Sequence, residues 1–475
     1  MIRTLAAFAA ACDGRLIGED RPFAELVIDS RAARAGDLFA ALAGEKLDGH
    51  QFVADAAGHG AAGALVLRKQ LVALPQIVVE SVEGAMARAA RRARAAFAGP
   101  VVGVAGSNGK TTAKEMIGAI LSQAGECLAT RGNLNNHLGV PMTLLRLRDT
   151  HASAVIEMGA NRAGDVAQLV QIARPTVGLI TNAGAEHLEG FGTLEGVARA
   201  EGEMVATLAS DASAILNADD PFVSLWRANT AARVVTFGLA REAHFRAEGL
   251  HQAVDAAGFS TVFTLLSPHG QCEIRLALAG EHNVRNALGA AAAAASAGAT
   301  LGQIRAGLAA MRAVKGRLQL RRRRDGAWLI DDSYNANPSS VRVALQVLRD
   351  MPGRRWLVLG DMAELGEAAA QSHHELGELA RAMGVERLYT YGSLAALAAE
   401  SFGAGAEAFR DAQALSQALQ DALQPDVCLL VKGSRVNRLE RIVEALAPEE
   451  REDRDDRDGH HGHDGPRGRA AGGVH

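Results

Sequence analysis

The sequence predicts an α/β protein built from three domains, in which mostly parallel sheets are covered by helices. Three observations support this prediction. The chain has 475 residues, about three times the length of a typical domain. Short apolar strands alternate with helical segments along most of it, as parallel sheets require. Breaks in the alternation, at Gly99-Pro100 and near Val314 to Arg317, divide the chain into three runs.

The composition excludes several classes of protein. Hydrophobic residues make up 48% and charged residues 22% of the chain, so it is not disordered, collagen-like or a coiled coil throughout. The formal net charge of -4 argues against nucleic acid as the main partner, because phosphate binding favours a basic excess. The sequence contains no stretch of about 18 strongly apolar residues, so membrane insertion is not expected.

The cysteines and the N-terminus bear on the compartment. The four cysteines form no C-x-x-C pair, so their spacing indicates neither a zinc site nor a disulfide framework. Reduced thiols in a cytoplasm fit best. Arg3 and the apolar run from Leu5 to Cys12 imitate a short signal peptide. Asp13-Gly14 ends this run and no cleavage-site spacer follows, so we expect a first helix from Thr4 to Cys12 instead.

Residues 1–99 are predicted to form an N-terminal domain, a small α/β module. Gly/Asp turns and one helical stretch separate the expected strands, which are Ala24 to Ile28, Leu38 to Leu42, Ala64 to Leu67 and Ile77 to Val79. A long helix from Ser81 to Phe97 sets arginines against an Ala/Met/Phe face, and Gly99-Pro100 ends it.

Residues 100–313 and 314–448 are predicted to form a central and a C-terminal α/β domain. The central strands are Val101 to Ala105, Ala154 to Ile156, Gly178 to Ile180 and Ala214 to Leu216, followed by helices Val284 to Ala297 and Leu301 to Met311. The C-terminal strands are Trp328 to Asp331, Trp356 to Gly360, Arg387 to Tyr391 and Val427 to Val431. Residues 449–475 are expected to be a disordered polar tail, because burial cannot offset their ordering entropy.

The most informative local sequence is GVAGSNGKTT, residues 103–112, which follows an apolar strand and opens a helix, Ala113 to Leu121. Its glycines let backbone N–H groups turn toward phosphate oxygens, and the helix N-terminus adds its dipole. Lys110 supplies a mobile charge and Thr111 can ligate magnesium. The spacing is G-x-x-G-x-x-G-K-T, because Val104 stands where a strict Walker A motif has glycine. The complete strand, loop and helix favour a phosphate loop over a chance glycine-rich turn.

Two further candidates follow neighbouring strands of the same predicted sheet. Glu157 ends the strand Ala154 to Ile156, at the edge where open α/β sheets bind ligands. Its carboxylate is the hard oxygen ligand that magnesium prefers. His187 lies on a Gly-rich loop after the strand that ends at Ile180. Alone, each would be read as a solvated residue, and the phosphate loop is what makes Glu157 a magnesium candidate.

With these pieces in order, the sequence resembles the Mur ligase family of ATP-dependent amide-forming enzymes of peptidoglycan synthesis. The resemblance covers residues 1–448 and rests on ordered segments that include VIDSRAARAGDLFAALAGEKLDGHQF (27–52), GSNGKTT (106–112), EMGANRAGDV (157–166), HNVRNAL (282–288), KGRLQ (315–319) and LVKGSR (430–435). Within the family, GNLNN (132–136), DDSYNANP (331–338) and GDMAELG (360–366) point to the member that adds D-alanyl-D-alanine.

The resemblance implies a uridine-nucleotide-binding module, a central P-loop ATPase and a C-terminal Rossmann-like domain. It implies that the carboxylate of UDP-N-acetylmuramoyl-tripeptide becomes an acyl phosphate, which the amine of D-alanyl-D-alanine attacks to give the UDP-muramoyl-pentapeptide precursor, ADP and phosphate. The implied cofactors are ATP and Mg²⁺, with two ions. We expect a cytoplasmic monomer, although the sequence leaves the oligomeric state open. Diaminopimelate and lysine both stay open for the third peptide residue.

The resemblance also implies roles for single residues. ATP would be bound by Gly106, Ser107, Asn108, Gly109, Lys110, Thr111, Thr112, His282, Asn283, Arg317 and Asp332. Magnesium would be held by Thr111, Glu157, His187 and Glu201. The substrates would be bound by Ser30 and Arg31 at the UDP moiety, Asn135 and Asn136 along the muramoyl-peptide path, and Lys432 and Arg435 near the incoming peptides. The catalytic set would be Lys110, His187, Glu201 and Arg317.

One position departs from the family pattern. The family usually has a lysine in the segment after the His187 loop, and its carbamylated side chain presents a carboxylate to the second magnesium. Here the segment reads VARAEGEM, and that position is Glu201. Glutamate already carries a carboxylate, so it can supply the oxygen without carbon dioxide, although its shorter reach would require a local shift or a bridging water.

Several alternatives stay open from the sequence. These are another Mur or folylpolyglutamate-type ligase, a P-loop phosphotransferase or nucleotide-dependent binding protein, and a non-catalytic relative in which Glu201 marks lost activity. The DSR segment (29–31) and DDSYNANP argue against a plain kinase, and Lys110, Glu157 and His187 argue against lost activity. Elsewhere, Arg321 to Arg324 are expected on a solvated edge strand and His373-His374 on an exposed helix.

Overall fold

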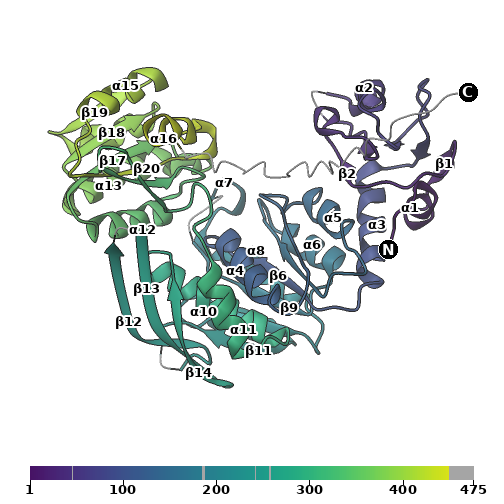
Figure 1. Ribbon diagram of the computed structural model, residues 1–475, viewed down its shortest axis with the longest axis horizontal. Helices are drawn as coiled ribbons and strands as arrows, with labels where there is room; N and C mark the ends of the chain where they lie inside the picture. The colour runs from purple at the N-terminus through teal and green to yellow at the C-terminus, as the bar shows by residue number, and fades with distance from the viewer. Residues whose placement is uncertain (45–46, 185–187, 241, 256–257, 449–475) are drawn as a thin grey trace, which may run out of the picture.

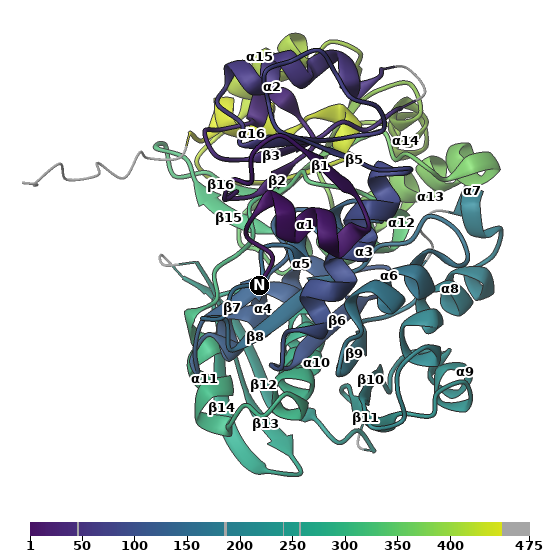
Figure 2. The ribbon, with the colours of Figure 1, turned by 90° about the vertical axis from the view of Figure 1, so that its right-hand side faces the viewer.

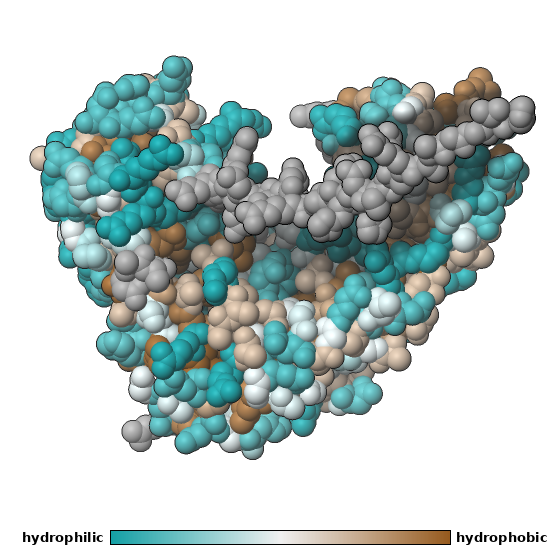
Figure 3. Space-filling model, in the orientation of Figure 1, coloured by the Kyte–Doolittle hydropathy of each residue, from teal (hydrophilic) through white to brown (hydrophobic). Residues whose placement is uncertain are grey.

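The computed structural model describes residues 1–44, 47–184, 188–240, 242–255 and 258–448. Figure 1 shows them as three lobes in an open V, with the first sheet in one arm, the last in the other and a six-stranded sheet at the base. The space-filling view is hollowed between the two arms (Figure 3). The predicted α/β fold with mostly parallel sheets is confirmed.

The first lobe holds a five-stranded sheet in the order β1-β5-β4-β3-β2, in which β1 is antiparallel to β5 and the other pairs are parallel. Thr4 caps the first helix by accepting a hydrogen bond from the N–H of Ala7. The elements are α1 (Leu5–Cys12), β1 (Arg15–Ile17), β2 (Leu26–Val27), η1 (Ser30–Ala32), β3 (Leu38–Ala40), η2 (Gly49–Phe52), α2 (Val53–Gly58), β4 (Gly63–Val66) and β5 (Gln76–Val78).

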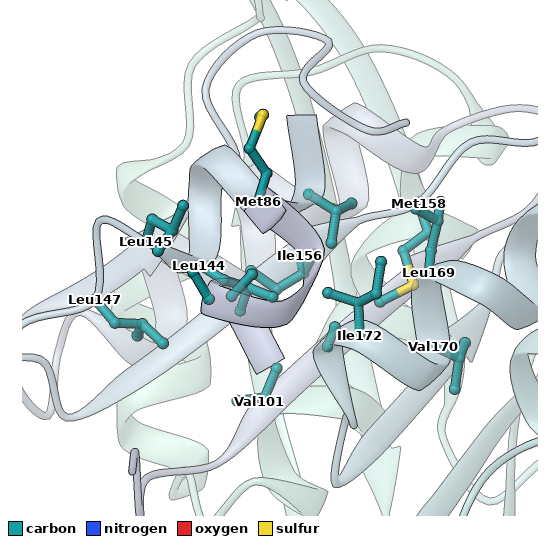
Figure 4. Packing of buried hydrophobic residues seen from close by; sticks show 14 of the residues in the cluster. Met86, Val101, Leu144, Leu145, Leu147, Ile156, Met158, Leu169, Val170 and Ile172 are labelled. Carbon is teal, nitrogen blue, oxygen red and sulfur yellow. The ribbon is translucent and has the colours of Figure 1, made fainter. Parts of the chain in front are cut away.

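The helix α3 (Val82–Ala95) joins the first lobe to the central one. Ser81 caps it, and it packs against α1 of the first lobe as well as against helices of the central lobe. In Figure 4, Met86 of this helix belongs to one cluster with Leu144, Ile156 and Ile172 of the central lobe. The core is therefore continuous across the chain position where the first two domains were predicted to separate.

The central sheet is parallel throughout and has the order β11-β10-β9-β6-β8-β7 (Figure 2). Two apolar clusters cover its faces, one under α5, α6 and α8 and the other under α4, α10 and α11. The elements are β6 (Val101–Ala105), α4 (Lys110–Leu121), β7 (Cys127–Ala129), α5 (Gly139–Leu144), β8 (Ser153–Glu157), α6 (Asp165–Ala173), β9 (Val177–Ile180), α7 (Leu188–Phe191), α8 (Leu194–Ala206), β10 (Ser213–Asn217), α9 (Val223–Ala228), β11 (Arg233–Phe237), α10 (Glu281–Ser296) and α11 (Leu301–Ala310).

An antiparallel three-stranded sheet, which the sequence analysis did not predict, extends from the central lobe toward the third. It consists of β12 (Arg246–Asp255), β13 (Gly258–Ser267) and β14 (Gly270–Leu276). Val254 and Phe259, at its β12–β13 end, pack against the apolar cluster of the third lobe. This sheet is therefore a bridge between the two lobes.

The third lobe holds a sheet in the order β15-β16-β20-β17-β18-β19, in which β15 is antiparallel to β16 and the other pairs are parallel. Across the described ranges, no helix has the length and apolar character needed to cross a membrane. The elements are β15 (Gln319–Arg322), β16 (Trp328–Asp332), α12 (Pro338–Arg349), β17 (Arg354–Gly360), η3 (Gly366–Ala368), α13 (Ala369–Ala382), β18 (Arg387–Tyr391), α14 (Ala395–Phe402), β19 (Ala406–Phe409), α15 (Ala412–Ala422), β20 (Val427–Lys432), η4 (Arg435–Asn437) and α16 (Glu440–Leu446).

Candidate functional site

The predicted phosphate loop joins the buried strand β6 to α4, which begins at Lys110, three residues earlier than expected. Gly106 and Gly109 have φ angles of +120° and +84°, which favour glycine. A Cβ atom at Gly109 would lie 2.4 Å from Oδ1 of Asn286 on α10. The backbone conformation therefore favours glycine at this position, and any other residue would also displace the Asn286 side chain. Thr112 lies in the first turn of α4.

Lys110 lies over its own loop. Its Nζ donates hydrogen bonds to the carbonyl oxygens of Gly106 and Ser107, the second at 3.1 Å. Ser107 is fixed in turn by Gly184, whose N–H donates to Ser107 Oγ at 2.8 Å. The loop therefore has a defined shape and carries its positive charge at the start of α4.

Two residues that follow β9 hold the peptide of Asn108. The Asn108 N–H donates to Asn182 Oδ1 at 3.0 Å, and the Asn108 carbonyl oxygen accepts from Thr181 Oγ1 at 2.7 Å and Asn182 Nδ2 at 2.9 Å. Neither residue was predicted from the sequence. Both directly follow a buried strand, at the carboxyl edge of the sheet. This position could have identified them from the sequence.

Glu157 is buried at the end of β8, as predicted, with 2% of its surface exposed. Its Oε1 accepts a hydrogen bond from Asn135 Nδ2 at 2.9 Å. Its Oε2 is buried without a hydrogen-bond partner among the described residues, and the ammonium of Lys114 lies 3.8 Å from it. A buried carboxylate oxygen that lacks a hydrogen bond fits a divalent cation, so this end of β8 fits magnesium.

Glu201 lies in α8 and is also buried, with 1% exposure. Its Oε2 accepts a hydrogen bond from the backbone N–H of Gly106 at 2.6 Å. The residue at the departure from the family pattern thus contacts the phosphate loop directly. His187, its predicted partner at a magnesium ion, lies outside the described residues.

Arg317, at the start of the predicted C-terminal domain, contacts the residue that follows Lys110 of the phosphate loop. Its Nη2 donates to Thr111 Oγ1 at 3.1 Å, and its guanidinium stacks on the ring of Tyr334, with 4.5 Å between Cζ and the ring centroid. Arg435 also lies over this ring, at 5.7 Å. Thr111 and Arg317, which are far apart in sequence, are thereby brought together.

Asp332 and Lys432 form a buried ion pair at the ends of two neighbouring strands. Lys432 Nζ donates to Asp332 Oδ2 at 2.6 Å and to the carbonyl oxygen of Asn335 at 2.9 Å. Burial raises the pKa of Asp332, and the charges of Lys432 and Arg317 oppose that shift. Lys432 is only 2% exposed, and its ammonium is bound by Asp332 and by the carbonyl oxygen of Asn335.

Asn283 and His282 begin α10, beside the loop. Asn283 Nδ2 donates to the carbonyl oxygen of Ala279 at 2.8 Å, and Asn283 Oδ1 accepts from Asn286 Nδ2 at 3.3 Å. Because Asn286 approaches Gly109, this pair connects Asn283 to the phosphate loop. Burial lowers the pKa of His282 to about 4, with smaller contributions from the charges of Arg285 and Lys432, so its imidazole is neutral at neutral pH.

The remaining predicted residues lie elsewhere. Ser30 and Arg31 are in η1 of the first lobe, where Arg31 forms a bidentate ion pair with Asp29 at 2.8 and 3.0 Å. Asn136 Oδ1 accepts hydrogen bonds from the N–H groups of Leu138 and Gly139 and so shapes the turn before α5. The hollow of the V separates the first lobe from the third (Figure 3).

Comparisons with known proteins identify the family. Three family models match the chain: "Mur ligase family, catalytic domain" over residues 22–97, "Mur ligase middle domain" over 104–294, and "Mur ligase, glutamate ligase domain" over 316–435. UDP-N-acetylmuramoyl-tripeptide--D-alanyl-D-alanine ligase of Escherichia coli (strain K12) is 43% identical over 448 residues, which cover 93% of this chain and 98% of the relative. The chain belongs to the Mur ligase family. As a Mur ligase, it is an ATP-dependent enzyme that forms amide bonds.

Solved structures of Mur ligases share the fold. A crystal structure of MurF from Acinetobacter baumannii has a TM-score of 0.84 and 35% identity to this Mur ligase, and covers 92% of this chain and 97% of that chain. MurF ligase from Thermotoga maritima, solved in complex with ADP, has a TM-score of 0.77 and 28% identity, with coverages of 89% and 96%. The three-domain architecture expected from the resemblance is therefore confirmed.

Proposed function

We propose that this Mur ligase joins D-alanyl-D-alanine to UDP-N-acetylmuramoyl-tripeptide at the expense of ATP, in peptidoglycan synthesis. One observation supports it most strongly: Arg317 contacts Thr111 at the start of α4, directly after the phosphate loop, in a chain 43% identical to a relative with that name. Glu157 lies 3.8 Å from Lys114 of the same helix. The other activities considered from the sequence have no comparable support.

The chemistry explains why cations are needed at the loop. A carboxylate is a poor electrophile, so its oxygen first attacks the γ-phosphorus of ATP, giving an acyl phosphate and releasing ADP. The amine then attacks the acyl carbon, phosphate leaves with the oxygen that bridged carbon and phosphorus, and the amine loses a proton. Two anions must approach each other in the first step, and Lys110 and Arg317 would offset their repulsion.

The nucleotide would lie across the loop and the start of α10. Backbone N–H groups from Gly106 to Thr112 would bind the phosphates at the N-terminus of α4. His282 and Asn283 would contact the adenine. Asp332, fixed by Lys432, would lie on the ribose or magnesium side.

Magnesium would be held by Thr111 and Glu157, which fit it by their oxygen donors and by the buried Oε2 of Glu157. A second ion would be held by Glu201 together with His187. When bound, the ions neutralise phosphate charge. Glu201 supports this role by being a buried carboxylate in contact with the loop.

The substrates would reach this site from both arms. Ser30 and Arg31 would face the UDP moiety from the first lobe, and Asn135 and Asn136 would line the muramoyl-peptide path. Arg435 would lie near the incoming peptide, with Lys432 acting behind it through Asp332. A monomer would suffice, because one chain supplies every proposed residue. A cytoplasmic location is consistent with the four free cysteines.

An acceptor screen tests the proposal. Phosphate release from purified protein with ATP, magnesium and UDP-muramoyl tripeptide is expected only when D-alanyl-D-alanine is added, and not with D-alanine or with glutamate. Lys110→Ala serves as the inactive control with unchanged folding. Release with glutamate but not with D-alanyl-D-alanine would assign the chain to a sister activity. Release without any amine would indicate a phosphotransferase or a simple ATPase.

A further inference from the structure

A closed ring of side-chain hydrogen bonds joins the phosphate loop to the third lobe. Asn108 Nδ2 donates to Ser339 Oγ at 3.1 Å, and Ser339 Oγ donates to Asn337 Oδ1 at 2.9 Å. Asn337 Nδ2 completes the ring by donating to Asn108 Oδ1 at 3.0 Å. Asn108 belongs to the central lobe, whereas Asn337 and Ser339 belong to the start of α12, so the ring crosses between lobes.

The third-lobe side of the ring is fixed by the cap of α12. Asn337 is the N-cap residue: its Oδ1 accepts from the N–H of Ser340 at 2.8 Å, and Ser340 Oγ accepts from the N–H of Asn337 at 3.0 Å. This capping box fixes the Asn337 side chain in one orientation, which directs its Nδ2 at Asn108. The direction of the amide is therefore set by the helix and moves with it.

The central-lobe side is fixed through the backbone of Asn108. Asn182 and Thr181 hold the Asn108 peptide, which leaves its side chain to face α12. Gly184 leaves room for this arrangement, since a Cβ atom there would lie 2.9 Å from Asn108 Nδ2. Asn108 therefore links the two lobes: its backbone belongs to the phosphate loop, and its side chain is hydrogen-bonded to the third lobe.

The third lobe is seated on the bridging sheet through the apolar cluster to which α12 belongs. Val254 and Phe259 pack against the cluster that contains Val341 and Leu345 of α12. Figure 1 shows the end of β12 and the start of β13 near this helix. If the third lobe leaves that seat, Asn337 and Ser339 withdraw together from Asn108, because both are carried by the same helix end.

We propose that Asn337 and Ser339 are positioning residues that couple the seating of the third lobe to the shape of the phosphate loop, acting through Asn108. Hydrogen bonds that share donors and acceptors in a ring strengthen one another, so the ring opens as a unit. While it is closed, it restrains the peptides on either side of Asn108, just before Lys110. The loop is then organised for phosphoryl transfer only when the third lobe is in place. The consequence for turnover rests on the proposed ligase function.

Three substitutions separate the ring from the cap. Ser339→Ala removes one member of the ring and leaves the capping box. Asn337→Asp keeps the oxygen that caps α12 but removes the donor to Asn108. Ser340→Ala is the matched control, because it removes a hydroxyl from the same cap and leaves the bonds of the ring in place.

Hydrogen exchange of the loop, residues 106–112, gives a readout that requires no turnover. In the whole protein with ADP and magnesium, Ser339→Ala and Asn337→Asp are expected to exchange at least about tenfold faster there than Ser340→Ala. Their kcat for phosphate release should also fall about tenfold, whereas the KM for UDP-muramoyl tripeptide should change by less than about twofold.

A double-mutant cycle tests the route through Asn108. Asn108→Ala combined with Ser339→Ala should lower kcat no further than Asn108→Ala alone, whereas the effect of Ser340→Ala should multiply with it. Loop exchange and kcat equal to those of Ser340→Ala, or multiplying effects of Asn108→Ala and Ser339→Ala, would overturn the inference. If the parent protein forms no amide product although the exchange differences appear, the proposed function fails and the coupling stands.

Discussion

The carboxylate of Glu201 accepts a hydrogen bond from the backbone N–H of Gly106, and 2.6 Å separates the two atoms. This contact places a charged side chain of α8 against the first glycine of the phosphate loop. It brings the residue at the departure from the family pattern into direct contact with the proposed nucleotide site.

Two substitutions of Glu201 should distinguish the effect of its charge from the effect of its hydrogen bond to Gly106. Glu201→Gln keeps an oxygen that can accept from Gly106 but removes the charge, so phosphate release should be severely impaired at saturating magnesium while the fold is retained. Glu201→Ala also leaves a buried N–H without its acceptor, which should cost about 1–3 kcal/mol of unfolding free energy. Bicarbonate should not stimulate the parent enzyme. A fully active Gln variant would show that the charge of Glu201 is not required.

Oε2 of Glu157 is buried without a hydrogen-bond partner among the described residues, so we expect Glu157 to contribute to magnesium binding. Glu157→Gln should raise the magnesium concentration for half-maximal phosphate release at least about tenfold, because it removes a charged oxygen ligand. Glu115→Gln is the matched control: Glu115 pairs with the same Lys114 at 2.9 Å, but its side chain is 42% exposed. Equal shifts in both variants would mean that the effect acts through Lys114 and not through a bound ion.

The ion pair of Lys432 and Asp332 should be stabilising only while both partners are present. Lys432→Met should lower the unfolding free energy by about 3–5 kcal/mol, because it leaves a buried carboxylate uncompensated. Adding Asp332→Asn should recover most of that loss. Urea unfolding of the parent, the single variant and the double variant provides the measurement. A single variant as stable as the parent would contradict the buried pair.

His282 should contribute to acid sensitivity. Burial holds its pKa at about 4 in the folded protein, below the value of 6.5 expected for an unfolded chain. Between these values the unfolded state binds more protons, so stability is lost as pH falls from about 6.5 toward 4, by at most about 1.4 kcal/mol per pH unit for one group. The parent should therefore lose more stability between pH 7 and pH 5 than His282→Gln does. Equal losses would assign the sensitivity to other groups.

Local features of this chain were predictable from sequence, whereas contacts across lobes were not. The limits of β6 agree with the prediction at both ends. Thr111 and Glu157 became candidates because Thr111 follows a glycine loop and Glu157 lies at the end of a strand, which the structure confirms for Glu157. The bond between Asn108 and Asn337 joins residues 229 positions apart, and no periodicity marks such a pair. The β12–β14 sheet was also missed. Its contact with the third lobe likewise joins segments that lie far apart in the sequence.

Two expectations about exposed residues were right only in part: His374 and Arg322 are exposed as expected, whereas His373 and Arg321 are buried. His373 is fully buried in α13, where its Nε2 accepts a hydrogen bond from the N–H of Met362 at 3.0 Å. Arg321 lies on the expected edge strand, β15, but it is buried and its Nη1 donates to Glu444 at 3.0 Å. Polar residues in such positions look solvated in sequence, because the partner that makes burial possible lies on a distant segment.

The most direct test of the proposed ligase reaction follows one oxygen. UDP-muramoyl tripeptide with ¹⁸O in its terminal carboxylate is incubated with ATP, magnesium and D-alanyl-D-alanine, and the nucleotide product and the released phosphate are weighed by mass spectrometry. We predict a UDP-muramoyl pentapeptide and one ¹⁸O in each phosphate, because the oxygen that attacks phosphorus leaves with it. Unlabelled phosphate, or phosphate released without the pentapeptide, would contradict ligation through an acyl phosphate.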